Sequence, residues 1–444
     1  MKTLRIGSGA GYSGDRIDPA VELATSGSLS YLVFECLAER TIALAQQSKL
    51  KGVSEGYDPL LEERMLAVLS ICRDRNIKII SNMGAANPIA AAIRTKEIAS
   101  ELNICGLRIA AITGDDVFSL IQDRDLLFEE NSFDVASLAG KIVSANAYLG
   151  AAPIVEALAA GADIVLIGRV ADPSLFLGPL IHEFGWAAND WRILGQGTVI
   201  GHLLECAGQI TGGYFADPGY KDVPDLAHLG FPLAEVTEDG TAVITKVEGS
   251  GGAITRAVCK EQLLYEIQNP AAYPTPDVLA DFSQVRFSER GRDRILVSGG
   301  SGSERPSALK VSVGYQDCYV GEGQISYAGP GALARAQLAK SIIAERIHES
   351  GYSELRFDLI GLNSILGDRL PVARCEPHEI RLRVVGRAES PKLASLIPRE
   401  VEALYTNGPA GGGGVTSSIR DAVGILSTFV HREMVTANIH FEVS

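Results

Sequence analysis

Apolar and polar positions follow two different patterns along the chain, and the first pattern fills its first part. Continuous apolar runs, typical of buried strands, alternate there with amphipathic segments of helical spacing. The expected strands are residues 3–9, 30–39, 77–88, 107–117 and the end of 152–174. The expected helices are residues 18–27, 60–76, 90–103 and the start of 152–174. This alternation predicts a parallel sheet covered on both faces. Without an eightfold count, we expect an open, mostly parallel, doubly wound α/β sheet over residues 1–195.

The pattern changes after about residue 195. Short strands there alternate apolar with polar residues, as half-buried antiparallel strands do. They lie at residues 294–300, 308–317, 354–362, 379–390 and 436–443. Residues 332–351 have helical spacing, residues 239–240 form an Asp-Gly hairpin signal, and residues 409–427 are interpreted as a glycine loop that runs into a helix. We therefore expect an α+β domain at residues 196–444, with a mixed or antiparallel sheet and glycine-rich loops.

Composition narrows the classes of function. The net charge of −14 argues against nucleic-acid binding, which needs a basic surface. Seven cysteines, at positions 36, 72, 105, 206, 259, 318 and 375, include no Cys-x-x-Cys pair, so we expect free thiols in a reducing cytoplasm. No apolar run reaches the length of a membrane span, so no membrane partner is expected.

Polar residues follow the expected parallel strands, where ligands bind on open α/β sheets. These strand-end residues are Ser8, Glu35, Asn82, Asn87, Asp115, Asp116, Arg169 and Asp172. The glycine-rich end of the first strand adds Gly9, Gly11, Asp15 and Arg16. We expect all of them to face one site. The alternative is that each residue only forms a turn or caps a helix, which Asn, Asp, Ser and Gly commonly do.

Gly9, Gly11 and Gly14 match the Gly-x-Gly-x-x-Gly fingerprint of dinucleotide binding, between a strand and a helix. Glu35 ends the next strand at a suitable distance. Two features count against NAD: the helix is short, and Asp15 places an acid where the pyrophosphate would meet the helix N-terminus. An NAD(P)-dependent oxidoreductase therefore stays as the alternative.

Other candidates lie in the second half of the chain. Gly212 and Gly213 form a glycine loop near Asp217, and Gly412 and Gly413 precede the expected helix as an anion-binding turn. Neither loop matches a nucleotide-binding P-loop. Glu205 is a candidate acid or base, whereas Cys206 is interpreted as packing because no partner for a catalytic thiol is expected nearby. The histidines show no metal-ligand spacing, so no metal is expected.

Six long motifs resemble one known family, the acyclic terpene utilisation proteins AtuA. They are "GSGAGYSGDRIDPAVELA", "YLVFECLAERTIALAQ", "SNMGAANP", "IGRVADPSLFLGPL", "TGGYFADPG" and "PAGGGGVTSSI". The resemblance covers essentially the whole chain. It implies a role in bacterial breakdown of acyclic terpenes such as citronellol and geraniol, which proceeds through CoA thioesters. Longer members carry a small C-terminal domain, so the resemblance also implies a separate partner subunit, or a non-catalytic role in a complex.

The leading hypothesis is a lyase or hydro-lyase that acts on a branched or hydroxylated carboxylate, free or as its CoA thioester, in a homo-oligomer. The sequence identifies no cofactor beyond the disfavoured NAD. Arg169 and Asp172 are taken as catalytic, with Arg169 holding the carboxylate. Glu35 or Asp116 is the expected acid or base. Asn82, Asn87 and the amides of the glycine loops are expected to stabilise an enolate oxyanion.

Overall fold

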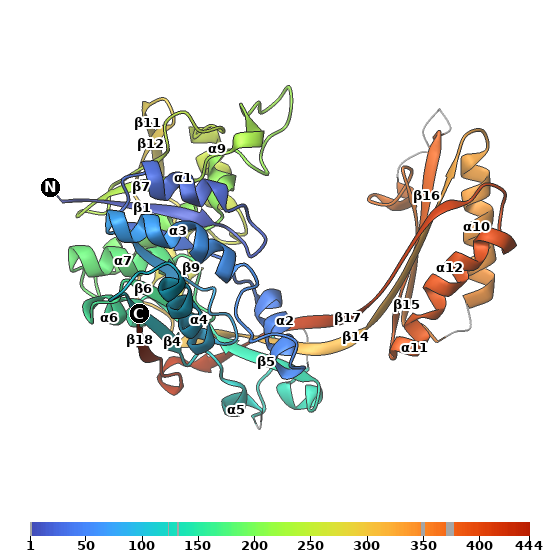
Figure 1. The fold of residues 1–444 in the computed structure, drawn as a ribbon, viewed down its shortest axis with the longest axis horizontal. Coiled ribbons are helices and arrows are strands. Elements are labelled where there is room, and N and C mark those ends of the chain that lie inside the picture. Colours follow the sequence, from blue (N-terminus) through green and yellow to red (C-terminus); the bar gives the residue numbers. More distant parts are fainter. Residues whose placement is uncertain (1, 123, 131–132, 348–350, 370–376) are drawn as a thin grey trace. The chain divides into compact units, whose positions relative to one another are not determined.

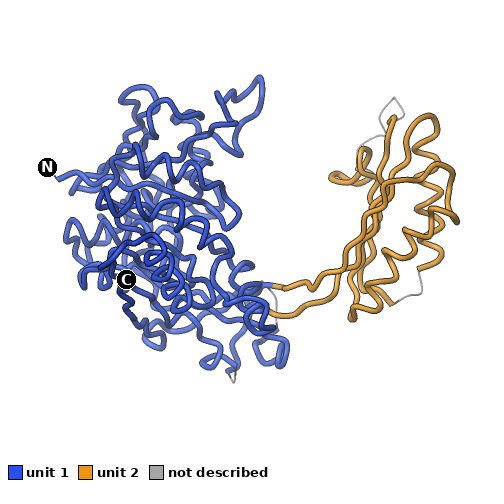
Figure 2. Tube along the Cα trace, in the orientation of Figure 1, with its two compact units in different colours: residues 1–314, 425–444 blue, residues 315–424 orange. Residues whose placement is uncertain are grey.

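The computed structural model describes residues 2–122, 124–130, 133–347, 351–369 and 377–444 (Figure 1). The chain forms two compact units (Figure 2). Unit 1 comprises residues 1–314 and 425–444, and unit 2 comprises residues 315–424. The units therefore divide elsewhere than at the boundary expected near residue 195.

Unit 1 contains a large sheet, which has 10 strands in the described part of the chain. Its centre is parallel, in the order β1, β2, β3, β6, β4. These strands are β1 (Thr3–Ala10), β2 (Tyr31–Phe34), β3 (Lys78–Ser81), β6 (Ile164–Ile167) and β4 (Arg108–Thr113). The mixed α/β class is confirmed, and the central strands lie within the apolar runs that predicted them.

Antiparallel strands extend the sheet at both edges. Beyond β1 lie β7 (Pro232–Thr237), β8 (Ala242–Lys246), β12 (Arg294–Ser298) and β11 (Arg286–Gly291), and β18 (Asn438–Val443) pairs with β4. The Asp-Gly signal is confirmed as the turn between β7 and β8. These strands follow residue 195, yet they continue the sheet that the first residues begin. This pairing is why residues 196–314 belong to unit 1.

Helices cover both faces of the sheet. The helices α1 (Asp18–Ser26), α3 (Leu61–Arg75) and α4 (Pro88–Glu101) share one apolar core with Ile164 and Leu166 of β6. The helices α6 (Ala152–Ala159), α7 (Ser174–Phe184) and α8 (Trp191–Leu204) share the other core with Val165 and Ile167. Successive side chains of one strand thus enter opposite cores, which explains the uninterrupted apolar run.

Shorter elements complete unit 1. They are α2 (Glu39–Leu50), α5 (Phe118–Ile121), β5 (Ile142–Ala147), α9 (Arg256–Leu264), β9 (Tyr273–Pro274), β10 (Leu279–Asp281) and β13 (Ser301–Ser303). Short 3-10 helices lie at Val135–Leu138, Ala207–Thr211, Leu226–His228, Gly367–Arg369 and Arg432–Met434, the fourth of them in unit 2. The strand expected at residues 30–39 ends at Phe34, and the polar segment before α2 is irregular.

Unit 2 contains a sheet in the order β15, β16, β14, β17. These strands are β15 (Glu354–Ile360), β16 (Glu379–Ala388), β14 (Ala308–Ala328) and β17 (Gly413–His431), and the last two continue into unit 1. The helices α10 (Ala332–Ile347), α11 (Pro391–Ala394) and α12 (Leu396–Asn407) complete the unit, and α10 and α12 pack on one face. The helix expected at 332–351 is confirmed up to Ile347.

The helix expected at residues 409–427 is wrong, because these residues form the long strand β17. The segment is rich in β-branched residues, which favour strands, and pairing with β14 outweighs the glycine-loop signal. The six described cysteines are free thiols, and Cys375 lies outside the described residues. In the described part of the chain, no helix combines the length and the apolar character needed to cross a bilayer.

Candidate functional site

A cavity of about 1200 Å³ lies in unit 1 where the segments after three parallel strands meet. Residues 11–16 follow β1, residues 35–39 follow β2, and residues 169–172 follow β6. Segments after residue 195 close the cavity. They include His202, Glu205, Cys206, Gly213, Tyr265, Tyr273, Leu309 and Lys310. The structure therefore brings together Gly11, Asp15, Arg16, Glu35, Arg169, Asp172 and Gly213 of the residues predicted from the sequence.

The other predicted residues lie elsewhere. Asn87, Asp115 and Asp116 line a second, smaller cavity of about 340 Å³. Asn87 caps α4 by accepting a hydrogen bond from the amide of Ala90, and Asp116 accepts one from the amide of Phe118. Both residues thus fit the capping alternative.

The remaining glycines and Ser8 have packing roles. Ser8 is fully buried, and a side chain on Gly9 would collide with Phe34. Gly212 has φ +104, which favours glycine, and is not among the residues lining the larger cavity. Gly412 and Gly413 belong to unit 2, and a strand rather than a helix follows them. An anion site at a helix N-terminus is therefore wrong for this glycine run.

The loop after β1 holds its own acid where a phosphate would be expected. The Asp15 carboxylate accepts hydrogen bonds from the amides of Gly11, at 2.9 Å, and Arg16, at 2.8 Å. The helix α1 begins only at Asp18. A Cβ at Gly11 would lie 2.5 Å from the carbonyl carbon of Cys206, so this glycine permits a close backbone approach. The loop geometry thus gives the dinucleotide alternative no support.

A buried arginine that the sequence analysis missed holds this loop. Arg64 of α3 is fully buried, and its guanidinium donates a 2.7 Å hydrogen bond to the carbonyl of Ser13. It also pairs with Asp58 at 3.1 Å, and Asp58 accepts a 2.6 Å hydrogen bond from the Ser13 hydroxyl. The available signal was a charged residue on the apolar face of α3, between Leu61 and Val68.

Glu35 is a buried carboxyl group with only amide donors as hydrogen-bond partners. Its Oε1 accepts from the side-chain amide of Asn82 and from the backbone amide of Leu37, both at 2.9 Å. Burial, reinforced by the nearby charge of Asp172, raises the pKa of Glu35 to about 8. Both donors meet Oε1, which leaves Oε2 to carry the proton. Asn82 also accepts from the amide of Cys36, so it orients Glu35, and it is fully buried outside the cavity lining rather than facing an oxyanion.

Arg169 forms the charged centre of the cavity wall. Its side chain is 2% exposed, donates to the carbonyl of Leu37, pairs with Asp172 at 3.1 Å and lies 4.2 Å above the ring of Tyr148. Burial alone would lower the pKa of Arg169, but the acidic groups of Asp172, Tyr148, Glu39 and Glu35 together outweigh it and keep the guanidinium charged. Behind the site, the Asp115 carboxylate accepts a 2.8 Å hydrogen bond from the Arg169 amide, so Asp115 fixes this backbone.

A second ionised group lies beside Arg169. Glu39, at the start of α2, accepts from the Tyr148 hydroxyl and from Lys310 at 3.3 Å. Burial opposes the ionisation of Glu39, but Arg169 and the Tyr148 hydroxyl outweigh it and lower its pKa to about 2. The cavity therefore contains a carboxyl group held protonated near neutral pH and another held ionised, which is how acid and base roles are separated in active sites.

His202 and Glu205 form a side-chain pair that the sequence analysis did not recognise. The ring atom Nδ1 of His202 lies 2.8 Å from Oε1 of Glu205. Burial raises the pKa of Glu205 to about 7. The sequence analysis named Glu205 as a candidate acid or base without connecting it to His202; the spacing of three residues at the end of a helix was the available signal. Burial also raises the pKa of Cys206, which keeps its thiol protonated and argues against a nucleophile.

No group of three or more His, Cys, Asp or Glu side chains in the described residues is arranged to hold a metal ion. Comparison with curated proteins gives no significant match. The model of the acyclic terpene utilisation family protein AtuA matches residues 4–441, which is almost the whole chain. The chain therefore belongs to the AtuA family, which implies a role in acyclic terpene utilisation.

Proposed function

We propose that the protein is a hydro-lyase that removes water from, or adds water to, a branched acyl chain carried as a CoA thioester. The observation that carries the proposal is Glu35, a carboxyl group whose burial raises its pKa to about 8 within a large cavity. A hydroxyl group leaves carbon readily only when it receives a proton, and a neutral carboxyl group can donate one. A buried carboxyl group that faces a cavity, has a raised pKa and has no basic hydrogen-bond partner is typical of a group that transfers protons.

The apolar part of the cavity wall supports a branched hydrocarbon substrate. Leu37, Phe231, Ile267, Leu309 and Phe429 line the cavity together with several tyrosines and prolines. Its volume of about 1200 Å³ lies slightly above the usual range for small-molecule sites, so it has room for a long acyl chain. The family's role in acyclic terpene utilisation agrees with such a chain.

The charges favour a thioester over a free carboxylate. The three basic side chains that line the cavity already have carboxylate partners: Arg169 pairs with Asp172, Lys310 with Glu39, and Arg16 with Asp18. Several further carboxyl groups also line the cavity, so a substrate carboxylate would meet net repulsion. A thioester carbonyl carries no charge, and the anionic phosphates of CoA lie at the far end of its pantetheine arm, away from the acyl group. In this proposal Arg169 holds Asp172 in place and does not bind a substrate carboxylate.

The reaction needs two proton transfers. In the dehydration direction a base removes a proton from the carbon next to the thioester carbonyl, and the C–H electron pair becomes the carbon–carbon double bond. The C–O bond of the 3-hydroxyl group breaks, and the oxygen takes the proton of Glu35 and leaves as water. The hydration direction reverses each step.

The test uses a panel of branched 3-hydroxyacyl-CoA thioesters and the matching free acids. The ultraviolet absorbance of the conjugated enoyl thioester measures turnover. We expect turnover of at least one thioester and of none of the free acids, and a loss of roughly 10²–10⁴-fold in the Glu35→Gln variant. Glu62→Gln, which changes an exposed carboxyl group of α3, is the matched control. Failure of the wild-type protein to convert any thioester would overturn the proposal.

A further inference from the structure

Asp172 combines a fixed side chain with an accessible carboxylate oxygen. Nη1 of Arg169 donates a 3.1 Å hydrogen bond to Oδ1 of Asp172, which is the hydrogen bond that this carboxylate accepts from the described residues. Its Oδ2 has no partner there and is not among the buried atoms that lack one. The Asp172 side chain is 33% exposed, whereas that of Arg169 is 2% exposed. Because Asp172 lines the cavity, Oδ2 is accessible to a substrate.

The charge of Asp172 acts on groups from several segments of the cavity wall. Burial raises the pKa of three of them: Glu35 after β2, Glu205 after α8 and Tyr273 in β9. The negative charge of Asp172 adds to each of these shifts. Burial also raises the pKa of Asp172 itself, so its exposed surface belongs to the cavity and not to the outside of the protein.

One residue connects Asp172 to the proposed acid. The amide of Leu37 donates a 2.9 Å hydrogen bond to Oε1 of Glu35, and its carbonyl accepts from the same Nη1 of Arg169 that holds Asp172. Two carboxyl groups that sense each other's charge do not readily ionise together. Glu35 has only amide donors and keeps its proton, whereas Arg169 stabilises the negative charge on Asp172. The two groups therefore differ in protonation, as an acid and a base must.

We propose that Asp172 is the base that removes the proton from the carbon next to the thioester carbonyl. This inference rests on the hydro-lyase reaction proposed above. Oδ2 forms a bond to the proton, the C–H electron pair becomes the double bond, the C–O bond breaks, and the hydroxyl group leaves as water with the proton of Glu35. Asp172 has then gained one proton and Glu35 has lost one. Transfer of one proton from Asp172 to Glu35 through solvent restores the pair, so the net change is the loss of one water molecule.

The other carboxyl groups of the cavity are less suited to this role. Burial opposes the ionisation of Glu39, but the neighbouring cation and hydrogen-bond donors outweigh it and lower its pKa to about 2, which makes its carboxylate a weak base. Both oxygens of Asp15 already accept backbone amides. Glu205 contacts the ring of His202 at 2.8 Å. For Asp172, burial raises the pKa and so makes its carboxylate a stronger base than an exposed aspartate.

The experiment measures dehydration of the branched 3-hydroxyacyl-CoA thioesters by Asp172→Asn, with thermal unfolding of the variant. Asp358→Asn is the matched control, because Asp358 also pairs with an arginine, Arg383 at 2.9 Å, but belongs to unit 2 and does not line the cavity. We expect Asp172→Asn to lose roughly 10²–10⁴-fold in turnover and Asp358→Asn to stay within about threefold of the wild type. If the wild type converts a thioester and Asp172→Asn does so equally well, the role of Asp172 is overturned and the hydro-lyase function stands. If the wild type converts none, both are overturned.

The pH profile separates a base from a charge that acts only through Glu35. Asp172→Asn also removes a charge that helps to raise the pKa of Glu35, so Glu35 should ionise at a lower pH in this variant. A missing base stays missing at every pH. We therefore expect the loss to persist at a lower pH, where Glu35 is protonated again. If turnover returns to the wild-type rate there, Asp172 acts only through Glu35 and the proposal is overturned.

A second variant covers the case in which Asp172→Asn does not fold. Asp172→Glu keeps the negative charge that Arg169 pairs with and moves the carboxylate by about one bond length. Since a displacement of about 1 Å can cost a reacting group 10²-fold, we expect kcat to fall on the order of 10-fold or more and KM to stay within about threefold. An unchanged kcat would show that only the charge at this position matters, which overturns the role of Asp172 as the base.

Discussion

Charged side chains gather in two places, the cavity of unit 1 and the open sheet face of unit 2, and only the first has the properties of a site. On the sheet face, Arg383 lies between Glu322, at 2.8 Å, and Asp358, at 2.9 Å. The hydrogen bond from Arg383 lowers the pKa of Glu322, as expected for a paired carboxylate. In the cavity, Glu35 has no arginine as hydrogen-bond partner, and burial raises its pKa to about 8.

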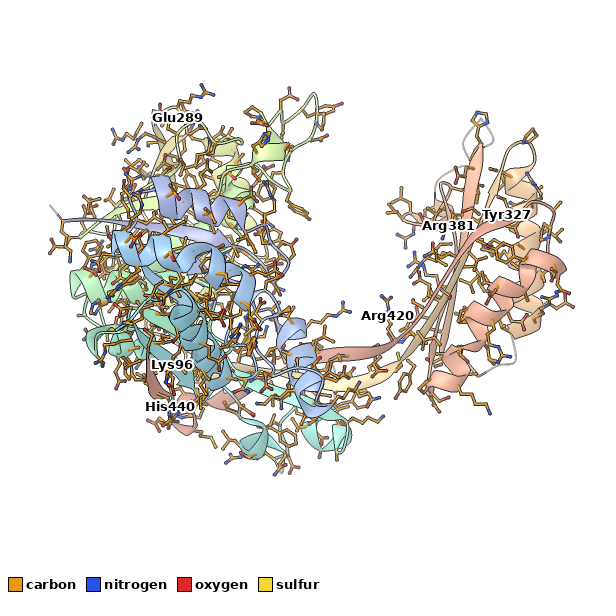
Figure 3. The ribbon with its side chains drawn as sticks, in the orientation of Figure 1. Lys96, Glu289, Tyr327, Arg381, Arg420 and His440 are labelled. Carbon is orange, nitrogen blue, oxygen red and sulfur yellow. The ribbon has the colours of Figure 1, made fainter. Side chains whose placement is uncertain are left out.

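The two clusters differ in their exposure to solvent and in how fully their charges are paired, rather than in the number of charges. Ile380, Leu382 and Val384 of β16 face α10 and α12, so the arginines between them point to the other side. Figure 3 shows Arg381 and Arg420 on this sheet. Water solvates these charged groups, and oppositely charged side chains pair with them. Buried carboxyl groups are less solvated and less fully paired, so their ionisation depends on the few groups that surround them.

The largest expected difference is in turnover. Glu35→Gln removes the proposed acid and should lower turnover roughly 10²–10⁴-fold. Glu322→Gln removes a carboxylate of the sheet face and should leave turnover unchanged, because unit 2 contributes no residue to the cavity wall. Rates on the thioester panel compare the two variants directly. Equal losses in both variants would show that the comparison is wrong.

The next largest effect concerns stability. Arg64→Met leaves the buried Asp58 carboxylate without its cation and the Ser13 carbonyl without the guanidinium donor, which should lower the free energy of unfolding by about 3–5 kcal/mol. Urea denaturation measures this loss. The loop after β1 would also lose its anchor, so turnover should fall in the fraction that stays folded. A change below about 1 kcal/mol would mean that the loop does not depend on this pair.

A smaller effect of opposite sign follows from the raised pKa of Glu35. Its pKa in the folded protein lies above the ordinary value of 4.5, so the contribution of Glu35 to stability is greatest below that pH and falls as the pH rises toward about 8. Gln does not ionise, and its amide oxygen can still accept from Asn82. Glu35→Gln therefore removes this pH-dependent contribution, and it should raise stability near pH 8 by at least about 1 kcal/mol relative to its effect near pH 5. Thermal unfolding at both pH values tests the sign.

The smallest effect belongs to the sheet face. Arg383→Met removes a partly exposed arginine from a network of ion pairs that solvent screens. The free energy of unfolding should therefore change by about 0–1 kcal/mol. Added salt should reduce the difference further. Denaturation at low and high ionic strength measures both. A loss as large as that of Arg64→Met would remove the distinction between the two clusters.

The sequence predicted the central strands well because burial on both faces leaves a continuous apolar run. It did not predict that β7 and β8 join the same sheet, since strand pairing is decided by tertiary contacts. Among the candidate residues, those after β1, β2 and β6 face the cavity, because parallel strands bring their carboxyl ends to one edge. Asn87 and Asp116 have the same residue types, but Asn87 caps α4 and Asp116 stabilises the turn before α5. Side-chain type alone does not separate a cap from a ligand.

His202 and Arg64 show why the rest of the site was missed. His202 lies in the last turn of α8, far along the chain from the strand ends, and only the tertiary fold brings it to the cavity. Arg64 holds the loop by donating to a backbone carbonyl, which every residue type has, so the loop sequence does not indicate this contact. The glycine run at 411–414 gave a false prediction rather than a missed residue, because it leads into a strand and not into a helix.

The central claim is that Glu35 stays protonated near neutral pH inside the cavity. Carbon-13 NMR of protein labelled at the glutamate side-chain carboxyl group measures this directly, with the Glu35 signal assigned by its absence in Glu35→Gln. The account predicts a titration midpoint near 8, well above the ordinary value of 4.5. A midpoint near that ordinary value would contradict it, because Glu35 would then be ionised at neutral pH and have no proton to donate.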